Sequence, residues 1–228
     1  MTVSSRGAGF RGGARWVGLP RLHVIAGDGE LVGTGFRDRL AGMVGVGGGR
    51  LAVHLRGREM SAARLCEVAA GAVEVGREGG SLIVVNDRLD VALAAGAGGV
   101  HLREDSMGPD EVREVAGAGR AGFLVGRSIH APEQAAALAD GRVDYLVLGS
   151  VYETASHPGA RPIGAGAVAA AAAAVAVPVL AIGGVGLGEV SGLLALGAHG
   201  VVVKSGVWGA DDPLPAVTRY LEMLHAEG

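Results

Sequence analysis

The sequence predicts a (β/α)8 barrel, in which eight parallel strands close into a ring surrounded by helices. Eight short apolar runs alternate with eight segments whose apolar residues are spaced three and four apart. Several of the runs are continuously apolar, which is typical of strands buried on both faces. The length of 228 residues also fits, since such barrels need roughly 200 to 250.

The first four predicted strands are LHVIAG at 22–27, LAVHLR at 51–56, SLIVVN at 81–86 and GGVHL at 98–102. Each is an apolar run too short for a buried helix. The alternative fold, a doubly wound open sheet, usually has a G-x-G-x-x-G turn after its first strand. The segment VIAGDGELVGTG does not match that turn, so we favour the barrel.

The last four predicted strands are AGFLVG at 121–126, VDYLVLG at 143–149, VPVLAIG at 177–183 and GVVVKS at 200–205. The clearest helical patterns are SAARLCEVAAGAVEVG, GPDEVREVAGAG and LGEVSGLLALGA, and PLPAVTRYLEMLHAEG closes the chain. We therefore expect one barrel domain over 19–228. Residues 1–18 are rich in Gly, Arg and Ser, lack the apolar segment of a signal peptide, and are predicted to form a flexible arm.

Composition excludes several classes of protein. The net charge is −3 and the arginines are scattered, which argues against a nucleic-acid partner. The longest alanine-rich run is interrupted by Pro178 and ends in two glycines, which argues against a membrane span. The single cysteine, Cys66, lies in a helical pattern and is better read as a small core residue than as a nucleophile. These features indicate a cytoplasmic enzyme or binding protein.

Polar residues gather where the predicted strands end. In barrels of this fold the carboxyl ends of the strands share one face, and active sites form there. The residues at these positions are His54, Arg56, Asn86, Asp87, His101, Arg103, Arg127, Ser128, His130, Ser150, Tyr152, Thr154, Gly183, Gly184, Lys204 and Ser205.

Two glycine-containing segments follow the last two strands, AIGGVGLGEV and VVVKSGVWGADDP. Glycines let backbone N–H groups approach an anion closely, and many barrels build a phosphate site from these two loops. The predicted contacts are Gly183, Gly184, Lys204 and Ser205. The alternative is a pair of ordinary tight turns, with Lys204 as a solvated surface charge.

Arginines at the strand ends suggest an anionic substrate. Arg56, Arg58, Arg103 and Arg127 each offer the planar, two-pronged hydrogen bonding that suits carboxylate or phosphate. Taken singly, an arginine at a strand end is as readily a structural ion-pair partner. Their convergence on one barrel mouth favours substrate binding.

His130 is the strongest candidate for proton transfer, because an imidazole titrates near neutral pH and can take up a proton and return it. The alternative is a histidine at the start of a helix, where Pro132 and Glu133 suit the first turn. His54 and His101 also lie at strand ends and compete for the role. The histidines lack the spacing of a metal site, so we expect no histidine-bound metal.

Asn86 and Asp87 allow two interpretations. They could hold Mg²⁺ at a phosphorylated substrate, or they could cap the helix that follows. A magnesium site would need a second carboxylate, for which Asp105 is the candidate.

Six motifs occur in the order typical of one family: VHLR, VNDRLDVALAAGAGGVHL, VGRSIH, DYLVLGSVYET, PVLAIGGV and GAHGVVVKSGVW. From about Leu22 onward the sequence resembles the thiamine phosphate synthase and thiazole tautomerase (TenI) superfamily. The resemblance implies a (β/α)8 barrel that acts on a phosphorylated thiazole in thiamin biosynthesis.

The motifs differ from those of the synthase branch of this family. His54 stands where that branch has glutamine, Arg58 where it has lysine, and Ser106 where it has a magnesium carboxylate, unless Asp105 takes that place. His157 stands at the position of a lysine that contacts pyrophosphate. GRSIH and VYET instead resemble the tautomerase branch, whose general base corresponds to His130.

The sequence therefore predicts an isomerase, a thiazole tautomerase that uses His130 and needs neither cofactor nor metal. The predicted substrate-binding residues are Arg56, Asn86, Arg127, Ser128, Thr154, Gly183, Gly184, Lys204 and Ser205. For Arg127 and Ser128 the alternative is that they only brace the loop that aims the imidazole. The alternatives are a divergent, Mg²⁺-dependent thiamine phosphate synthase and a catalytically silent barrel that binds thiazole phosphate. Whether the barrel forms a homodimer stays open.

Overall fold

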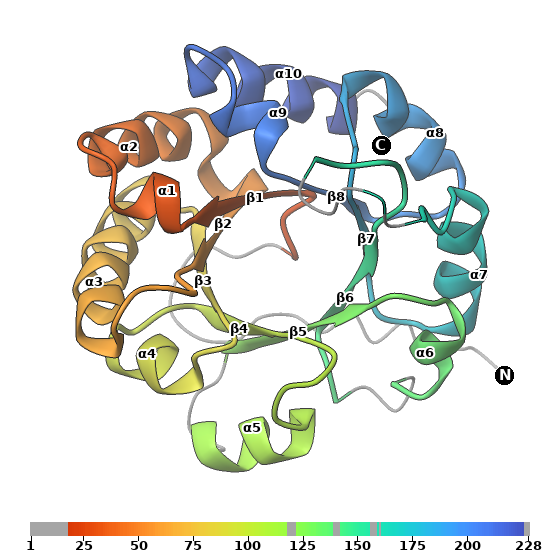
Figure 1. Ribbon diagram of the computed structural model, residues 1–228, viewed down its shortest axis with the longest axis horizontal. Coiled ribbons are helices and arrows are strands. Elements are labelled where there is room, and N and C mark those ends of the chain that lie inside the picture. The colour runs from red at the N-terminus through yellow and green to blue at the C-terminus, as the bar shows by residue number, and fades with distance from the viewer. Residues whose placement is uncertain (1–17, 118–121, 139–141, 156–158, 160, 226–228) are drawn as a thin grey trace, which may run out of the picture.

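A computed structural model shows a closed barrel of eight parallel strands in sequence order, with β1 also paired to β8 (Figure 1). The structure describes residues 18–117, 122–138, 142–155, 159 and 161–225. The strands are β1 Leu22–Gly27, β2 Leu51–Arg56, β3 Leu82–Asn86, β4 Gly99–Leu102, β5 Leu124–Ile129, β6 Tyr145–Gly149, β7 Val179–Ile182 and β8 Gly200–Val203. The predicted fold class is confirmed.

Helices surround the barrel (Figure 1). They are α1 Asp28–Leu31, α2 Phe36–Gly47, α3 Ala62–Gly79, α4 Leu89–Ala94, α5 Pro109–Ala116, α6 Glu133–Ala136, α7 Gly166–Ala174, α8 Val190–Ala195, α9 Ser205–Trp208 and α10 Pro213–His225, with 3-10 turns η1 Gly48–Arg50 and η2 Leu187–Glu189. Within the described ranges, no helix is long and apolar enough to cross a membrane.

The barrel has two apolar layers because successive residues of a strand face opposite sides. The larger layer lies between the strands and the helices and includes Leu22, Val24 and Ala26 of β1. The smaller one fills the barrel interior and includes Leu82 and Val84 of β3. Interior side chains are the ones that can reach the barrel mouth, so this alternation decides which residues of a strand face a ligand.

The fifth strand differs from the prediction in a way that matters for the site. The apolar run predicted a strand over 121–126, whereas β5 spans Leu124–Ile129 and pairs Leu102 with Arg127 and Leu146 with Arg127 on its two sides. Arg127 and Ser128 therefore belong to the strand itself. A strand can end in polar residues when these face a cavity or solvent, so the end of an apolar run is a poor guide to its boundary.

Candidate functional site

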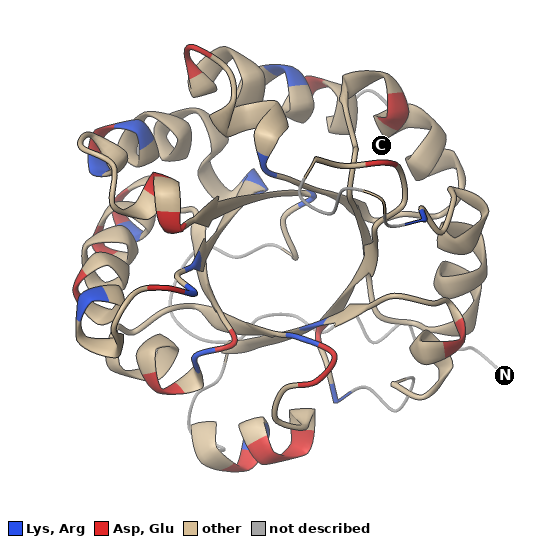
Figure 2. Cartoon of the chain, in the orientation of Figure 1, with Lys and Arg blue, Asp and Glu red and all other residues tan. Residues whose placement is uncertain are grey.

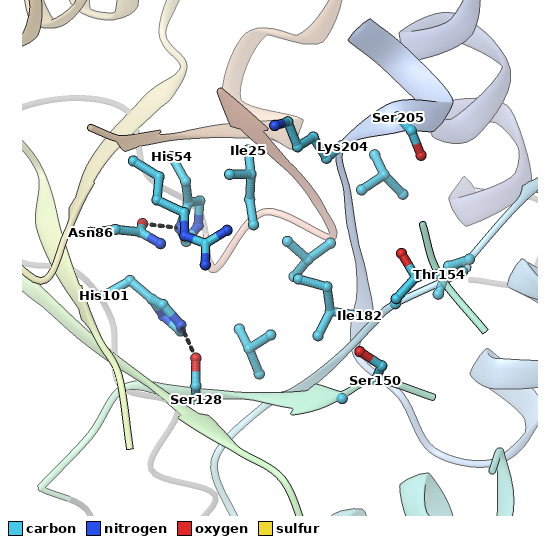
Figure 3. A pocket seen from close by; sticks show the side chains of 18 of the residues that line it. Ile25, His54, Asn86, His101, Ser128, Ser150, Thr154, Ile182, Lys204 and Ser205 are labelled. Atoms are coloured by element: carbon cyan, nitrogen blue, oxygen red, sulfur yellow. Dashed lines mark hydrogen bonds between the residues drawn. The ribbon is translucent and has the colours of Figure 1, made fainter. Parts of the chain in front are cut away.

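A cavity of about 720 Å³ opens at the carboxyl ends of the strands (Figure 3). The predicted site residues that line it are Arg56, Asn86, Ser128, His130, Thr154, Gly183, Gly184, Lys204 and Ser205. Among its other lining residues, Arg58, Arg103, Asp105 and Ser150 were also considered from the sequence, whereas Glu104 and Tyr220 were not. The barrel topology thus brings residues from all eight strands, or from the loops that follow them, into one pocket.

Arg127 is the predicted site residue that does not line this cavity. Leu124 belongs to the barrel interior, so Ser128, four residues later, faces the same way, and Arg127 faces the opposite side. Its guanidinium donates hydrogen bonds to the backbone oxygens of Met107 at 3.1 Å and Glu104 at 2.7 Å. Arg127 therefore braces the loop between β4 and α5.

His130 follows β5 directly, and the main chain holds its ring. The Nδ1 atom lies 2.7 Å from the carbonyl oxygen of Gly149, at the end of β6. Because a carbonyl only accepts, Nδ1 carries the proton and Nε2 of the neutral ring keeps its lone pair. The backbone N–H of His130 also donates to Oε1 of Gln134 at 2.6 Å. This arrangement leaves Nε2 as the basic atom of a residue at the cavity wall.

Glu104 lies beside that basic nitrogen, although the sequence did not single it out. Its Oε2 atom is 3.7 Å from Nε2 of His130, and both side chains are about half exposed. The Gln134 amide, which holds the His130 backbone, also donates to Oε1 of Glu104. The carboxylate is thus placed to stabilise a protonated imidazole. Its position two residues beyond β4 was the signal that could have identified it.

Three arginines concentrate positive charge at the cavity wall, and Figure 2 shows basic residues at strand ends around the barrel opening. Burial, followed by the neighbouring charges of Arg58 and Arg103, lowers the pKa of Arg56 from its ordinary value. A cation that is partly buried among other cations is stabilised by a bound anion. This wall of the cavity therefore suits a carboxylate or phosphate.

The glycine pair after β7 is required by close packing. Gly183 and Gly184 have positive φ angles of 96° and 65°, and a Cβ atom on Gly184 would overlap the carbonyl oxygen of Glu153.

Ser205 begins α9, whose first N–H groups have no partner within the helix. Lys204 lies nearby, but its Nζ is 3.3 Å from Oε2 of Glu30, so its charge is partly matched.

Two buried histidines, His54 and His101, also line the cavity. His54 is 1% exposed and His101 is 4% exposed. Burial lowers the pKa of His54 from 6.5 to about 4 and holds the pKa of His101 well below its ordinary value. Both are therefore neutral at physiological pH, and Nε2 of His101 lies 2.9 Å from the Ser128 hydroxyl. Burial distinguishes these two histidines from His130, whose side chain is exposed.

The carboxylates at the position that the resemblance assigns to magnesium are engaged by other side chains. One oxygen of Asp87 accepts a hydrogen bond from the Ser106 hydroxyl, and the other lies 3.5 Å from the Arg103 guanidinium. Asp105 is also paired with Arg103, at 3.0 Å. A divalent cation bound here would have to displace the Arg103 guanidinium from both carboxylates. Neither Asn86 nor Asp87 caps the following helix, since the N-cap of α4 is Arg88.

The fold and the pocket define the class of protein: a (β/α)8 barrel whose polar side chains converge at the carboxyl ends of its strands. The chain belongs to the thiamine monophosphate synthase (TMP-TENI) family, whose model matches residues 38–207. The family acts in thiamine biosynthesis, which agrees with the resemblance seen in the sequence.

Known relatives carry the synthase name. The chain is 34% identical over 204 residues to a thiamine-phosphate synthase of Coprothermobacter proteolyticus, a match that covers 90% of this chain and 94% of the relative. It is 36% identical over 174 residues to the thiamine-phosphate synthase of Gloeobacter violaceus, but spans only 50% of that longer protein. The solved thiamine phosphate pyrophosphorylase of Pyrococcus furiosus aligns with a TM-score of 0.77 and 29% identity, over 91% of this chain and 96% of that one. These names favour the synthase alternative over the predicted isomerase.

Proposed function

We propose that the protein is a thiazole tautomerase, which converts the exocyclic tautomer of a carboxythiazole phosphate into the aromatic thiazole. The observation that carries the proposal is the His130 ring, whose Nδ1–H is held by the Gly149 carbonyl while Nε2 is left basic at the cavity wall. The chemistry needs one proton moved between two carbons of the same substrate. A single well-placed base is sufficient for that.

The reaction balances with His130 as the only group that exchanges a proton. Nε2 removes the proton from C2 of the ring, and the electron pair shifts through the ring toward the exocyclic double bond. The exocyclic carbon then takes the proton back from Nε2–H, which regenerates the neutral imidazole. Between the two steps the imidazole is positively charged, and the Glu104 carboxylate 3.7 Å away stabilises that charge. Formation of the aromatic ring drives the conversion.

The charge distribution of the cavity supports this substrate. The phosphate would lie against the loops after β7 and β8, at Gly184 and Ser205, with Lys204 beside it. The substrate carboxylate would pair with Arg56, whose surroundings are already cationic. Fixing both anionic ends holds the ring in one orientation relative to the imidazole, which is most of what the catalyst must do.

The second candidate is thiamine phosphate synthase, which the names of the relatives favour. It requires a magnesium site and a pyrophosphate site. At the first, Asp87 and Asp105 are engaged by Arg103 and Ser106. At the second, the expected lysine is replaced by His157, which lies outside the described residues. A barrel that only binds the aromatic phosphate is the third candidate.

The test follows conversion of the tautomer by absorbance or NMR, after subtraction of the uncatalysed rate. We expect His130→Gln to reduce the catalysed rate by about 10²- to 10⁴-fold, because general acid–base catalysis contributes that much. The matched control is His225→Gln, at the exposed end of α10 and away from the cavity, which should behave as wild type.

The same preparations separate the candidates. A tautomerase turns over in EDTA, whereas a synthase forms thiamine phosphate from the pyrimidine pyrophosphate and the thiazole phosphate only with Mg²⁺ present. Equal tautomerisation rates for wild type and His130→Gln would overturn our assignment. Thiamine phosphate formation without tautomerisation would establish the synthase instead.

A further inference from the structure

One glutamine side chain joins the two loops that carry His130 and Glu104. Gln134 lies in α6 and is half-buried. Its Oε1 atom accepts hydrogen bonds from the backbone N–H of His130 at 2.6 Å and from that of Ala131 at 3.0 Å. Its Nε2 atom donates to Oε1 of Glu104. The amide therefore bridges the chain just after β5 to the loop between β4 and α5.

The partners of Gln134 allow only one orientation of its amide. Backbone N–H groups can only donate, so the amide oxygen must face His130 and Ala131. An ionised carboxylate can only accept, so the amide nitrogen must face Glu104. A half-turn of the amide would set its NH2 group against two donors and its oxygen against the carboxylate. The orientation in the structure satisfies all three hydrogen bonds.

This bridge holds the main chain of the loop that carries His130. Pro132 has no N–H group, so His130 and Ala131 supply all the backbone donors of residues 130–132, and Gln134 accepts from both. His130 is thus held at two points. Gln134 binds its backbone N–H, and the Gly149 carbonyl lies 2.7 Å from Nδ1 of its ring. With the backbone and the ring both held, the free Nε2 atom has a fixed place at the cavity wall.

Glu104 is also held at two points. Arg127 donates to its backbone oxygen at 2.7 Å, and Gln134 donates to its Oε1 atom. Its other oxygen, Oε2, is the one that lies 3.7 Å from Nε2 of His130. Both holding residues come from β5 and α6, which flank His130 in the sequence. One short stretch of chain therefore sets the spacing between the imidazole and the carboxylate.

We infer that Gln134 is a positioning residue, which keeps the His130 imidazole and the Glu104 carboxylate in the arrangement that proton transfer needs. Gln134 does not line the cavity, so it acts through these two residues. The effect on catalysis rests on the proposed function, because it assumes that His130 moves the proton. The hold on the main chain is expected to matter more than the hold on the carboxylate, since an exposed ion pair contributes little.

Nitrogen NMR tests the bridge without measuring any reaction. Gln134 is the only glutamine in the sequence, so labelling glutamine side chains of the full-length protein with ¹⁵N gives a single NH2 group. We expect its protons to exchange slowly with solvent and its resonances to move in Glu104→Met, which removes the acceptor. An amide that exchanges like one in free solution and is unaffected by Glu104→Met would overturn the inference.

Tautomerisation kinetics test the role in catalysis. Gln134→Met keeps a similar length but loses the amide oxygen and nitrogen. We expect kcat to fall by about 10- to 10²-fold, because misplacing a reacting group by about 1 Å can cost that much, while KM stays near its wild-type value. Glu133→Met, at the exposed neighbouring position of α6, is the matched control. A loss in Gln134→Met no larger than in the control would contradict the positioning role.

Exchanging the two side chains distinguishes positioning from a general effect on stability. In Gln134→Glu the new carboxylate still accepts from both N–H groups but repels Glu104. Adding Glu104→Gln again sets an amide against a carboxylate, so the double variant should recover kcat to within about fivefold of wild type. A double variant no faster than Gln134→Glu would rule out the positioning role. A wild type without tautomerisation would overturn the proposed function, whereas the NMR spectra would still decide whether the bridge exists.

Discussion

The His130 ring has two partners, a backbone carbonyl and a side-chain carboxylate, and the two interactions differ in strength. Its tautomer is set by a backbone carbonyl at 2.7 Å, which no side-chain change removes. Its electrostatic partner is the Glu104 side chain at 3.7 Å, in a setting where both groups are about half exposed. Ion pairs in such settings contribute little, since water screens them. The geometry therefore ranks the imidazole far above the carboxylate in importance.

Substitution of Glu104 tests that ranking. We expect Glu104→Gln to lower kcat for tautomerisation by no more than about fivefold, because an exposed pair contributes about 0.2 to 1 kcal/mol. Glu114→Gln, on the exposed face of α5 and away from the cavity, is the matched control. A loss as large as that of His130→Gln would contradict the ranking and make Glu104 a direct participant in proton transfer.

Strand β5 shows how far an element can be read from sequence. The strand was predicted from its apolar run, and its existence is confirmed, but the run ends at Gly126 while the strand continues to Ile129. The period of two, applied to the true strand, places Ser128 in the cavity and Arg127 behind it. Apolar runs report burial between sheet and helices, so they miss polar residues that a strand directs into a cavity.

The roles of His23 and His54 could not be predicted either, because an apolar run does not show which groups meet inside the barrel. His23 is one polar residue in an otherwise apolar strand, and nothing in the local pattern shows that it faces another histidine. His54 was considered as a base, whereas burial keeps its pKa near 4. Which groups meet across a barrel depends on the register between strands. The pairing of Ile25 with His54 and of Val84 with Gly99 could not be derived from either run alone.

A glycine in β5 is required by the residue opposite it. A Cβ atom on Gly126 would overlap the ring of Tyr145, which is paired with it across β5 and β6 and is fully buried. We expect Gly126→Ala to lower the free energy of unfolding by about 1 to 3 kcal/mol, the usual cost of overpacking a core. Urea denaturation measures this directly.

A double-mutant cycle identifies the cause. Tyr145→Leu removes the overlapping ring, so the combined variant should be more stable than the sum of the two single changes, by about 0.5 to 3 kcal/mol. Simple additivity would show that the Gly126 effect does not come from the Tyr145 ring.

At the scale of the whole molecule, the buried histidines make stability depend on mild acid. The pKa of His54 is 6.5 in the unfolded chain and about 4 in the folded one, so the unfolded state binds more protons between these values. The contribution of His54 to the free energy of unfolding is therefore fully present above about pH 6.5. It is lost as the pH drops toward 4, a change of about 3 kcal/mol. His23 and His101 shift in the same direction.

Denaturation midpoints in urea at about pH 7 and about pH 5 should differ measurably, and most carboxylates titrate below this window. His54→Gln keeps one donor and one acceptor at the same place but cannot be protonated, so it should make the pH dependence shallower. An identical slope in wild type and His54→Gln would show that His54 is not buried neutral.

Gly149 has a consequence for anyone who wishes to redesign this pocket. A Cβ atom at this position would overlap the backbone of Ile182 in the next strand, so the residue is confined by β7 while its carbonyl holds His130. The nitrogen of His130 that stays basic is therefore determined by the backbone of the sheet and not by any side chain. Grafting His130 onto another barrel would transfer an imidazole, but fixing its proton on Nδ1 would also require a backbone carbonyl placed as that of Gly149 is.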